Sequence, residues 1–228
     1  MFSAFRRTEG AMFSASILVW ILPVVLAITV HEAAHGYVAR AFGDPTAELA
    51  GRITLNPLRH IDPVGTIAVP LGLYLLSSAM GGGGILFGWA KPVPVNFNRL
   101  RRPKADMLWV AAAGPLSNLL MALGWAFMLV LLSGSAPDSY AYGASLMAGA
   151  GISINGVLML LNLLPVPPLD GGRIAISLLP DRLAREYARI EPFGFLILLA
   201  LLTTGMLNAV LGPLLDGFMA LLQMLFGN

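Results

Sequence analysis

The chain has 228 residues, of which 57% are hydrophobic and only 11% are charged, and its mean hydropathy is +0.78. This composition lies outside the range of soluble domains and is typical of a protein embedded in a membrane. The formal net charge is only +2, and the 14 basic residues cluster between apolar blocks as topology signals do, so we predict no nucleic-acid partner. The sequence contains no cysteine, so any metal must be held by His, Asp or Glu.

The first apolar block predicts a retained membrane helix. Residues 11–30 carry no charge over 20 positions, which at about 1.5 Å per residue is enough to cross a hydrocarbon core of about 30 Å. The helical pattern continues to about Phe42, where the sequence GDP stops it. Arg6 and Arg7 precede the block as in a signal peptide, but the run is too long for one and ends in HEAAH rather than in a cleavage site.

Three later uncharged runs predict further membrane spans, at 107–133, 139–169 and 192–215. A shorter apolar stretch at 217–226 follows a break near NAVLGP and predicts a hairpin partner for the last span. We therefore expect an all-α polytopic membrane protein with about five or six transmembrane helices. It forms a single domain, 1–228, with a core at 12–180 and a C-terminal helical hairpin at 192–227.

The segment at 64–84 is short for a membrane span. It is apolar for only about 15 residues and then runs into four consecutive glycines. Either it enters the membrane and returns to the same side, or it crosses with help from the glycine-rich stretch. The distribution of basic residues barely separates these alternatives. A metal shared between the first helix and the helix at 139–169 requires the late parts of both at one depth, which favours the re-entrant form.

Two stretches of the loop between the first two spans alternate apolar and polar residues with period two. They are GRITLNP at 51–57 and KPVPVNFN at 91–98. Pro92 and Pro94 confine the second stretch to the edge of a sheet, because proline has no N–H to donate. The pattern predicts a small membrane-associated β element.

The first helix ends in three residues that together suit zinc chemistry. His31 and His35 are four positions apart, so one helix face can present both imidazoles to one metal ion. Glu32 lies about 100° around the helix, where it can activate a water as general base. Polar groups in a membrane helix are costly and usually mark function. The alternative interpretation is two helix-facing histidines with a capping or paired glutamate.

A catalytic zinc also needs a third protein ligand and an open position. His60 and Asp170 are the candidates. Asp170 lies in NLLPVPPLDGG at 162–172, where three prolines unwind the chain after a long uncharged run, so it must face protein or a water-filled cavity. Alternatively, Asp170 caps the helix that begins with GGRIAISLL, and both roles can hold together.

Three motifs occur in a fixed order on the hydrophobic segments: HEAAHG at 31–36, AGPLSNLL at 113–120 and NLLPVPPLDGG at 162–172. In this order they resemble the site-2 protease family of intramembrane zinc metalloproteases. NPLRHIDPVGT at 56–66 and FGWAKPVPVN at 87–96 resemble the short bacterial members of that family. We find neither the PDZ domain nor the CBS-like domain that other members carry.

The resemblance implies that His31, His35 and Asp170 bind Zn²⁺ and that Glu32 is the catalytic base. It also implies that Asn162 is catalytic, as a donor to the substrate carbonyl or its oxyanion. The zinc would lie inside the helix bundle toward the cytoplasmic side, and a substrate helix would have to unwind before it is cut.

Further residues are predicted to contact the substrate. Asn118 would face the same cavity, although hydrogen bonding between helices is an equally good account of it. An exposed edge at 51–57 or 91–98 would add the unwound substrate as an extra strand, which brings it against Val93 and Val95. His60 belongs to the loop motif of the subgroup, and we expect a structural role for it rather than metal binding.

We expect a zinc-dependent intramembrane endopeptidase that cleaves transmembrane segments of membrane proteins, in regulated proteolysis or in clearance of remnant peptides. It would reside in the plasma membrane, with the lipid bilayer and a membrane-protein substrate as partners and without a soluble cofactor. The alternative is a membrane metal-binding or ion-transport protein that uses the same cluster. Transport predicts ionisable groups at staggered depths on several helices, whereas 107–133 and 192–215 carry none. A third possibility is a catalytically inactive scaffold of the same fold. The presence of both motifs, HExxH at 31–35 and LDG at 169–171, argues against it.

Overall fold

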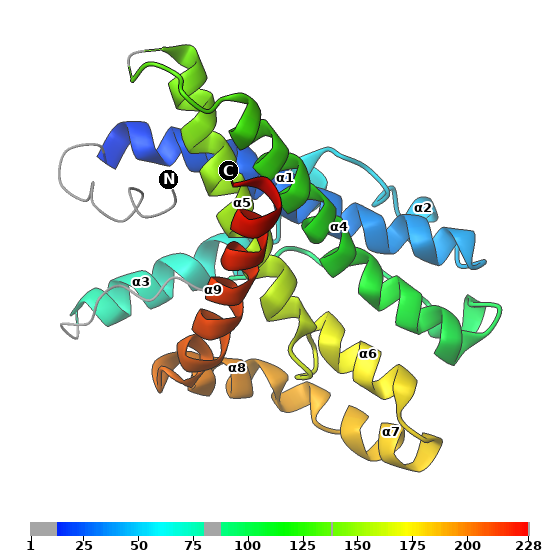
Figure 1. Ribbon diagram of the computed structural model, residues 1–228. Helices are drawn as coiled ribbons and strands as arrows, with labels where there is room; N and C mark the ends of the chain where they lie inside the picture. Colours follow the sequence, from blue (N-terminus) through cyan, green and yellow to red (C-terminus); the bar gives the residue numbers. More distant parts are fainter. Residues whose placement is uncertain (1–12, 80–87, 138, 228) are drawn as a thin grey trace.

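The computed structural model describes residues 13–79, 88–137 and 139–227, and within these ranges all regular structure is helical (Figure 1). Four helices are long and apolar enough to cross a membrane: α1 (Phe13–Ala41), α4 (Pro103–Leu131), α5 (Tyr140–Leu163) and α9 (Met206–Phe226). The all-α polytopic class is thus confirmed. The described residues contain four candidate spans where the sequence predicted five or six.

Shorter helices connect the four candidate spans. They are α2 (Thr46–Leu49), α3 (Val69–Ala79), α6 (Asp170–Leu178), α7 (Asp181–Ala188) and α8 (Gly194–Thr203). Single 3₁₀ turns lie at Pro57–Arg59, Phe97–Arg99 and Glu191–Phe193, and a π-helical turn at Pro63–Ala68 leads into α3.

The core of the bundle is formed by α1, α4 and α5, with α9 packed on α4 and α5 (Figure 1). Small residues allow this close approach, as is usual between membrane helices. A Cβ on Gly151 of α5 would come within 2.4 Å of the Trp125 ring of α4. The buried apolar cluster comprises Ala122, Ala126, Ile152, Met159, Phe218 and Leu222. This cluster joins α4, α5 and α9, and α1 packs against both α4 and α5, which brings its two histidines beside α4.

The ends of the first and third long helices agree with the sequence. α1 continues to Ala41, and Gly43 then adopts a φ of +102°, which ends the helix without the strain a side chain would add. Ser139 caps α5, because its side chain accepts from the N–H of Tyr142. α5 ends at Leu163, just before the proline-rich turn that leads to α6.

The predicted boundary inside the C-terminal hairpin is wrong. The sequence predicted a span at 192–215 with a break near NAVLGP, but the break lies at Gly205, and α9 continues through Pro213. Gly205 adopts a left-handed φ of +75°, which ends α8. Pro213 removes only one backbone donor, which membrane helices tolerate. The first arm, α8, has 10 residues and is too short to cross a bilayer.

The predicted β element does not form, because neither 51–57 nor 91–98 contains a strand. In place of a neighbouring strand, side chains satisfy the backbone of the second stretch. The contacts are Arg52 Nη2 to Lys91 O at 2.6 Å, Val93 N to Glu32 Oε2 at 2.9 Å and Asn96 N to Asp44 Oδ2 at 2.6 Å. At 91–98, the alternation of apolar and polar residues thus reflects an extended segment that has no partner strand.

The segment at 64–84 is described only up to residue 79, and residues 80–87 lie outside the described ranges. Among the described elements, α3 packs mainly against its own π-helical turn and extends away from the bundle (Figure 1). The two flanks of the segment are hydrogen-bonded together. Trp89 N–H donates to Gly65 O at 3.0 Å, and Lys91 N–H donates to His60 O at 2.9 Å. The residues at 60–65 and 89–91 therefore lie side by side.

Candidate active site

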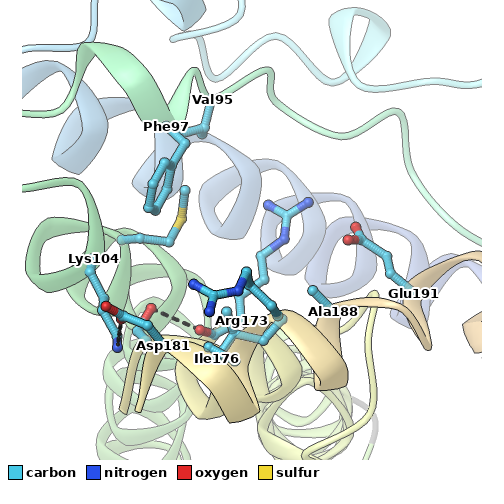
Figure 2. Close-up of a pocket in the computed structure, with 12 residues that line it drawn as sticks. Val95, Phe97, Lys104, Arg173, Ile176, Asp181, Ala188 and Glu191 are labelled. Carbon is cyan, nitrogen blue, oxygen red and sulfur yellow. Dashed lines mark hydrogen bonds and ion pairs between the residues drawn. The ribbon is translucent and has the colours of Figure 1, made fainter. Parts of the chain in front are cut away.

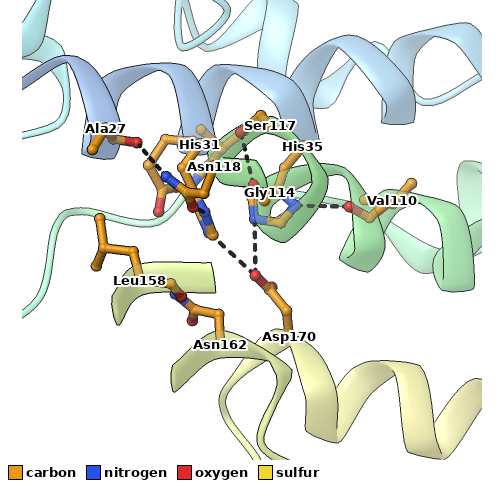
Figure 3. A network of polar contacts seen from close by, with 12 residues as sticks. Ala27, His31, His35, Val110, Gly114, Ser117, Asn118, Leu158, Asn162 and Asp170 are labelled. Atoms are coloured by element: carbon orange, nitrogen blue, oxygen red, sulfur yellow. Dashed lines mark hydrogen bonds and ion pairs between the residues drawn. The ribbon is translucent and has the colours of Figure 1, made fainter. Parts of the chain in front are cut away.

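His31 and His35 lie one turn apart on α1 and point toward Asp170 at the first turn of α6 (Figure 3). All three residues are buried. The distance from Asp170 Oδ2 is 3.2 Å to His31 Nε2 and 3.3 Å to His35 Nε2. A tetrahedral zinc ion with bonds of about 2.0–2.1 Å separates its ligand atoms by about 3.3–3.4 Å. The two separations from Asp170 match this spacing, and the three donor atoms all lie within 4.8 Å of one another, so the cluster can hold a zinc ion.

Asp170 does not cap its helix in the way that the sequence allowed. It is the first residue of α6, and the helix end has no side-chain cap. Its Oδ2 lies between the two imidazoles and has no other partner among the described residues. The proline-rich turn before Asp170 contacts the chain after α6. The Tyr187 hydroxyl of α7 donates to Pro165 O, and Gly194 at the start of α8 lies so close that an added Cβ would come within 1.9 Å of Pro167 O.

Gly114 of α4 provides space beside the two imidazoles (Figure 3). A Cβ at this position would lie 2.5 Å from both His31 Nε2 and His35 Nε2. Real Cβ contacts are not this short, so any side chain here would displace the two donor atoms. The glycine therefore keeps open the volume that a metal ion needs.

The other ring nitrogen of each histidine is bonded to α4. His31 Nδ1 lies 2.6 Å from Asn118 Oδ1, and His35 Nδ1 lies 2.7 Å from the carbonyl oxygen of Val110. Because both partners are acceptors, each Nδ1 carries the proton and each Nε2 lone pair is free to bind a metal. Val110, Gly114 and Asn118 follow each other at intervals of four, so one face of α4 supports both histidines.

Asn118 is fully buried and joins three helices. Its Nδ2 donates to Ala27 O of α1 at 3.3 Å and to Asn155 Oδ1 of α5 at 2.9 Å. Asn155 in turn donates to Gly151 O at 2.8 Å. The structure thus shows the helix-to-helix hydrogen bonding that was one of the two accounts of Asn118, while contact with substrate stays a prediction.

Glu32 faces the extended segment at 91–96. Its half-buried carboxylate accepts the N–H of Val93 at 2.9 Å. The Val93 side chain is buried over Gly36 of α1, where an added Cβ would lie 3.3 Å from it. Val95, two residues on, is half-buried, and its backbone N–H and C=O make no hydrogen bond to any described residue. The segment therefore passes beside the predicted base.

Two further residues bind the backbone of the segment at 91–96 through hydrogen bonds. The sequence did not single them out. Arg52 is 7% exposed and donates to the carbonyls at its start. Asp44 is fully buried and accepts from Thr46 and from the backbone N–H of Asn96. Burial alone would raise the pKa of Asp44, but these hydrogen bonds outweigh it and hold the pKa below its ordinary value. The position of Asp44 in GDP, directly after α1, is the only signal the sequence offers for it.

The remaining predicted residues lie outside the ligand cluster. Asn162 is half-buried on the last turn of α5, and its Nδ2 donates to Leu158 O at 3.0 Å (Figure 3). His60 is buried in the loop after α2, with Nε2 3.0 Å from Thr54 O. Among the described residues, the cluster able to hold a metal contains only His31, His35 and Asp170.

Comparison with known proteins identifies the family. The model for "Peptidase family M50" matches residues 137–205. The chain is 39% identical over 206 residues to "Putative zinc metalloprotease YwhC" of Bacillus subtilis (strain 168), covering 86% of this chain and 85% of that protein. It is 34% identical over 202 residues to "Putative zinc metalloprotease Rip2" of Mycolicibacterium smegmatis, covering 86% of this chain and 70% of that protein.

The chain is also 31% identical over 201 residues to "Putative zinc metalloprotease Rip2" of Mycobacterium tuberculosis (strain ATCC 25618 / H37Rv), covering 87% of this chain and 70% of that protein. No solved structure matches the chain. None of the matched names supports the alternative of an ion transporter. The buried His/His/Asp cluster and these relatives lead to one conclusion: the chain belongs to peptidase family M50, the site-2 proteases, and is an intramembrane zinc metalloprotease.

Proposed function

We propose that His31, His35 and Asp170 bind the zinc ion and that Glu32 is the general base for hydrolysis of a peptide bond in a substrate's transmembrane segment. The observation that carries this assignment is the separation of 3.2 and 3.3 Å between the carboxylate oxygen and the two imidazole nitrogens. When bound, zinc supplies Lewis acidity that activates water and polarises the scissile carbonyl. Glu32 takes the proton of the attacking water and delivers it to the leaving amine.

The neighbouring amides have supporting roles in this proposal. Asn118 orients the His31 ring and fixes its tautomer, as the backbone carbonyl of Val110 does for His35. Asn162 donates to the substrate carbonyl as negative charge develops on its oxygen. Its Nδ2 is bonded to Leu158 O of its own helix, so this role requires a rotation of the side chain when substrate binds.

We propose that the substrate binds as an extended strand along residues 93–95. Its backbone can use the groups of Val95, which are unpaired among the described residues. The N–H of Val93 already donates to Glu32, so a substrate paired at 93–95 lies directly beside the base. Pro92 and Pro94 carry no N–H, which limits the pairing to this short edge.

Cysteine trapping tests this binding mode, because the chain contains no native cysteine. Val95→Cys, combined with Glu32→Gln to prevent turnover, is expected to form a disulfide with a cysteine near the scissile bond of a single-span substrate. Val93→Cys is the second test position, and Tyr140→Cys, fully exposed at the other end of α5, is the control. Each cysteine variant is also made with Glu32 unchanged to check that it is active. If both are active, yet with Glu32→Gln they give no more cross-linked product than the control, the binding mode is wrong.

We propose that 64–84 re-enters the membrane. Two hydrogen bonds between its flanks support this, one from Trp89 to Gly65 and one from Lys91 to His60.

The end of the bundle that carries the site also carries most of the basic residues, in the loops at 40–104 and 173–189. By the positive-inside rule this end faces the cytoplasm, and we assign the protein to the plasma membrane. The mutual packing of α1, α4, α5 and α9 supports a single intramembrane domain.

Removal of the metal tests the proposed activity. The purified protein in detergent is expected to cleave a single-span model substrate, to lose this activity when its zinc is removed by a chelator, and to regain it on addition of zinc but not of magnesium. Magnesium is the control because it prefers oxygen ligands in octahedral geometry. Undiminished cleavage by a preparation that metal analysis shows to be free of zinc would contradict the proposal.

A further inference from the structure

A cavity of about 440 Å³ lies between the residues around 95–97, the start of α4, and helices α6 and α7 (Figure 2). Arg173 lines it and follows Asp170 by three residues on α6, about 4.5 Å along the helix axis. Val95 lines it from the other side and belongs to the segment whose Val93 N–H contacts Glu32. The cavity is therefore lined by a residue about one helical turn from Asp170 and by a residue of the edge proposed for substrate binding.

Among the basic residues of the cavity, only Arg173 has a guanidinium group without a partner in the described part of the chain. Lys104 is engaged, because its Nζ lies 2.7 Å from Asp181 Oδ1 and 2.5 Å from Leu179 O. The half-buried Arg173 side chain makes no hydrogen bond or ion pair within the described residues, whereas Arg185 is exposed and is attracted to the Asp181 carboxylate.

The other carboxylate of the cavity, Glu191, is exposed and lies at the end away from Lys104 and Asp181, while the Arg173 side chain projects between Phe97 and Ile176 (Figure 2). Arg173 therefore provides an unpaired positive charge inside the cavity.

We propose that this cavity is a specificity pocket for an acidic side chain of the substrate. The inference rests on the proposed proteolytic function and names a feature of its substrates. Arginine binds a carboxylate through paired hydrogen bonds, and it does so most strongly where apolar groups reduce contact with water. Val95, Phe97, Met107 and Ile176 provide such an apolar lining. At about 3.3 Å per extended residue, the acidic position lies about two to four residues from the scissile bond.

An anionic lipid headgroup is the other ligand that an unpaired arginine can attract at a membrane surface. The geometry favours the substrate, because the cavity begins one helical turn from Asp170 and borders the backbone edge at Val95. A lipid headgroup requires neither of these features.

The test compares substrates that differ in one residue. Single-span substrates carrying Glu, Gln or Lys at each position within about five residues of the scissile bond are cleaved by wild type and by variants of Arg173. At one position wild type is expected to show a kcat/KM about 10-fold higher for Glu than for Gln, as for one charge-assisted pair. Arg173→Gln is expected to bring this ratio to about one, and Arg173→Glu to favour Lys. The ratio is measured on one preparation, so partial misfolding does not change it.

Arg189→Gln, an exposed arginine at the end of α7 that does not line the cavity, is the matched control and should keep the wild-type ratio. Equal cleavage of the Glu, Gln and Lys substrates by active wild type would overturn the pocket and leave the protease intact. A change in Arg173→Gln confined to nanodiscs containing phosphatidylglycerol, with an unchanged ratio in phosphatidylcholine, would assign the cavity to lipid. Cleavage of none of the substrates by zinc-loaded wild type would instead contradict the proposed function.

Discussion

Glu32→Gln is expected to reduce cleavage of a single-span substrate by at least about 10²–10⁴-fold, the usual contribution of a general base, while zinc stays bound. Glutamine can still accept the N–H of Val93, which is 2.9 Å from Glu32 Oε2, so the extended segment keeps its position. It cannot take a proton from water. Cleavage is measured by the appearance of product in detergent, and zinc by metal analysis of the same preparation.

Glu48→Gln is the matched control for this change. Glu48 lies on α2, where it pairs with Arg40 at 3.1 Å on the protein surface, so its loss should leave activity unchanged. Cleavage by Glu32→Gln at the rate of Glu48→Gln would remove Glu32 from the mechanism.

Gly114→Ala is expected to weaken zinc binding by at least about 100-fold, the upper end of the effect of removing an outer partner of a metal ligand. The reason is steric, because the new methyl group would lie 2.5 Å from both His31 Nε2 and His35 Nε2. Alanine favours a helix over glycine, so the change should not unfold α4. Zinc content, cleavage and helical circular dichroism of the purified variant measure the three effects.

Gly124→Ala on the same helix separates the steric effect from the change in helix propensity. A Cβ at Gly124 meets no atom within 4 Å, so this variant should keep its zinc and its activity. If Gly114→Ala binds zinc as tightly as Gly124→Ala, the ligand arrangement described here is incorrect.

The sequence predicts the His31, His35 and Asp170 cluster because the chemistry of its members is evident from short stretches of sequence. His31 and His35 share a face by their spacing alone, and the proline-rich turn before Asp170 indicates a polar group that must face inward. The supporting groups are less visible. The partner of His35 is the backbone carbonyl of Val110, which any residue would provide, and Gly114 acts by lacking a side chain. The interval of four that links Gly114 to Asn118 is the signal that could have revealed this face of α4.

Two features of the structure differ from the prediction, the missing β element and the position of the break in the C-terminal hairpin. In both cases the physical reason cannot be seen in the pattern of apolar and polar residues. Alternation at 91–98 reports an extended chain, but a strand also requires a neighbouring backbone, and here Glu32 and Asp44 satisfy the N–H groups instead. In the C-terminal hairpin, apolar composition does not locate the break. The backbone conformation of Gly205 does, while Pro213 is accommodated inside α9.

The central claim is that three residues hold zinc while a fourth acts as the base. Zinc content and cleavage, measured on the same preparations of wild type, Glu32→Gln and Asp170→Ala, test it most directly. We predict about one zinc per chain in wild type and in Glu32→Gln, cleavage by wild type alone, and loss of both zinc and cleavage in Asp170→Ala. Stoichiometric zinc in Asp170→Ala, or wild-type cleavage by Glu32→Gln, would contradict the account.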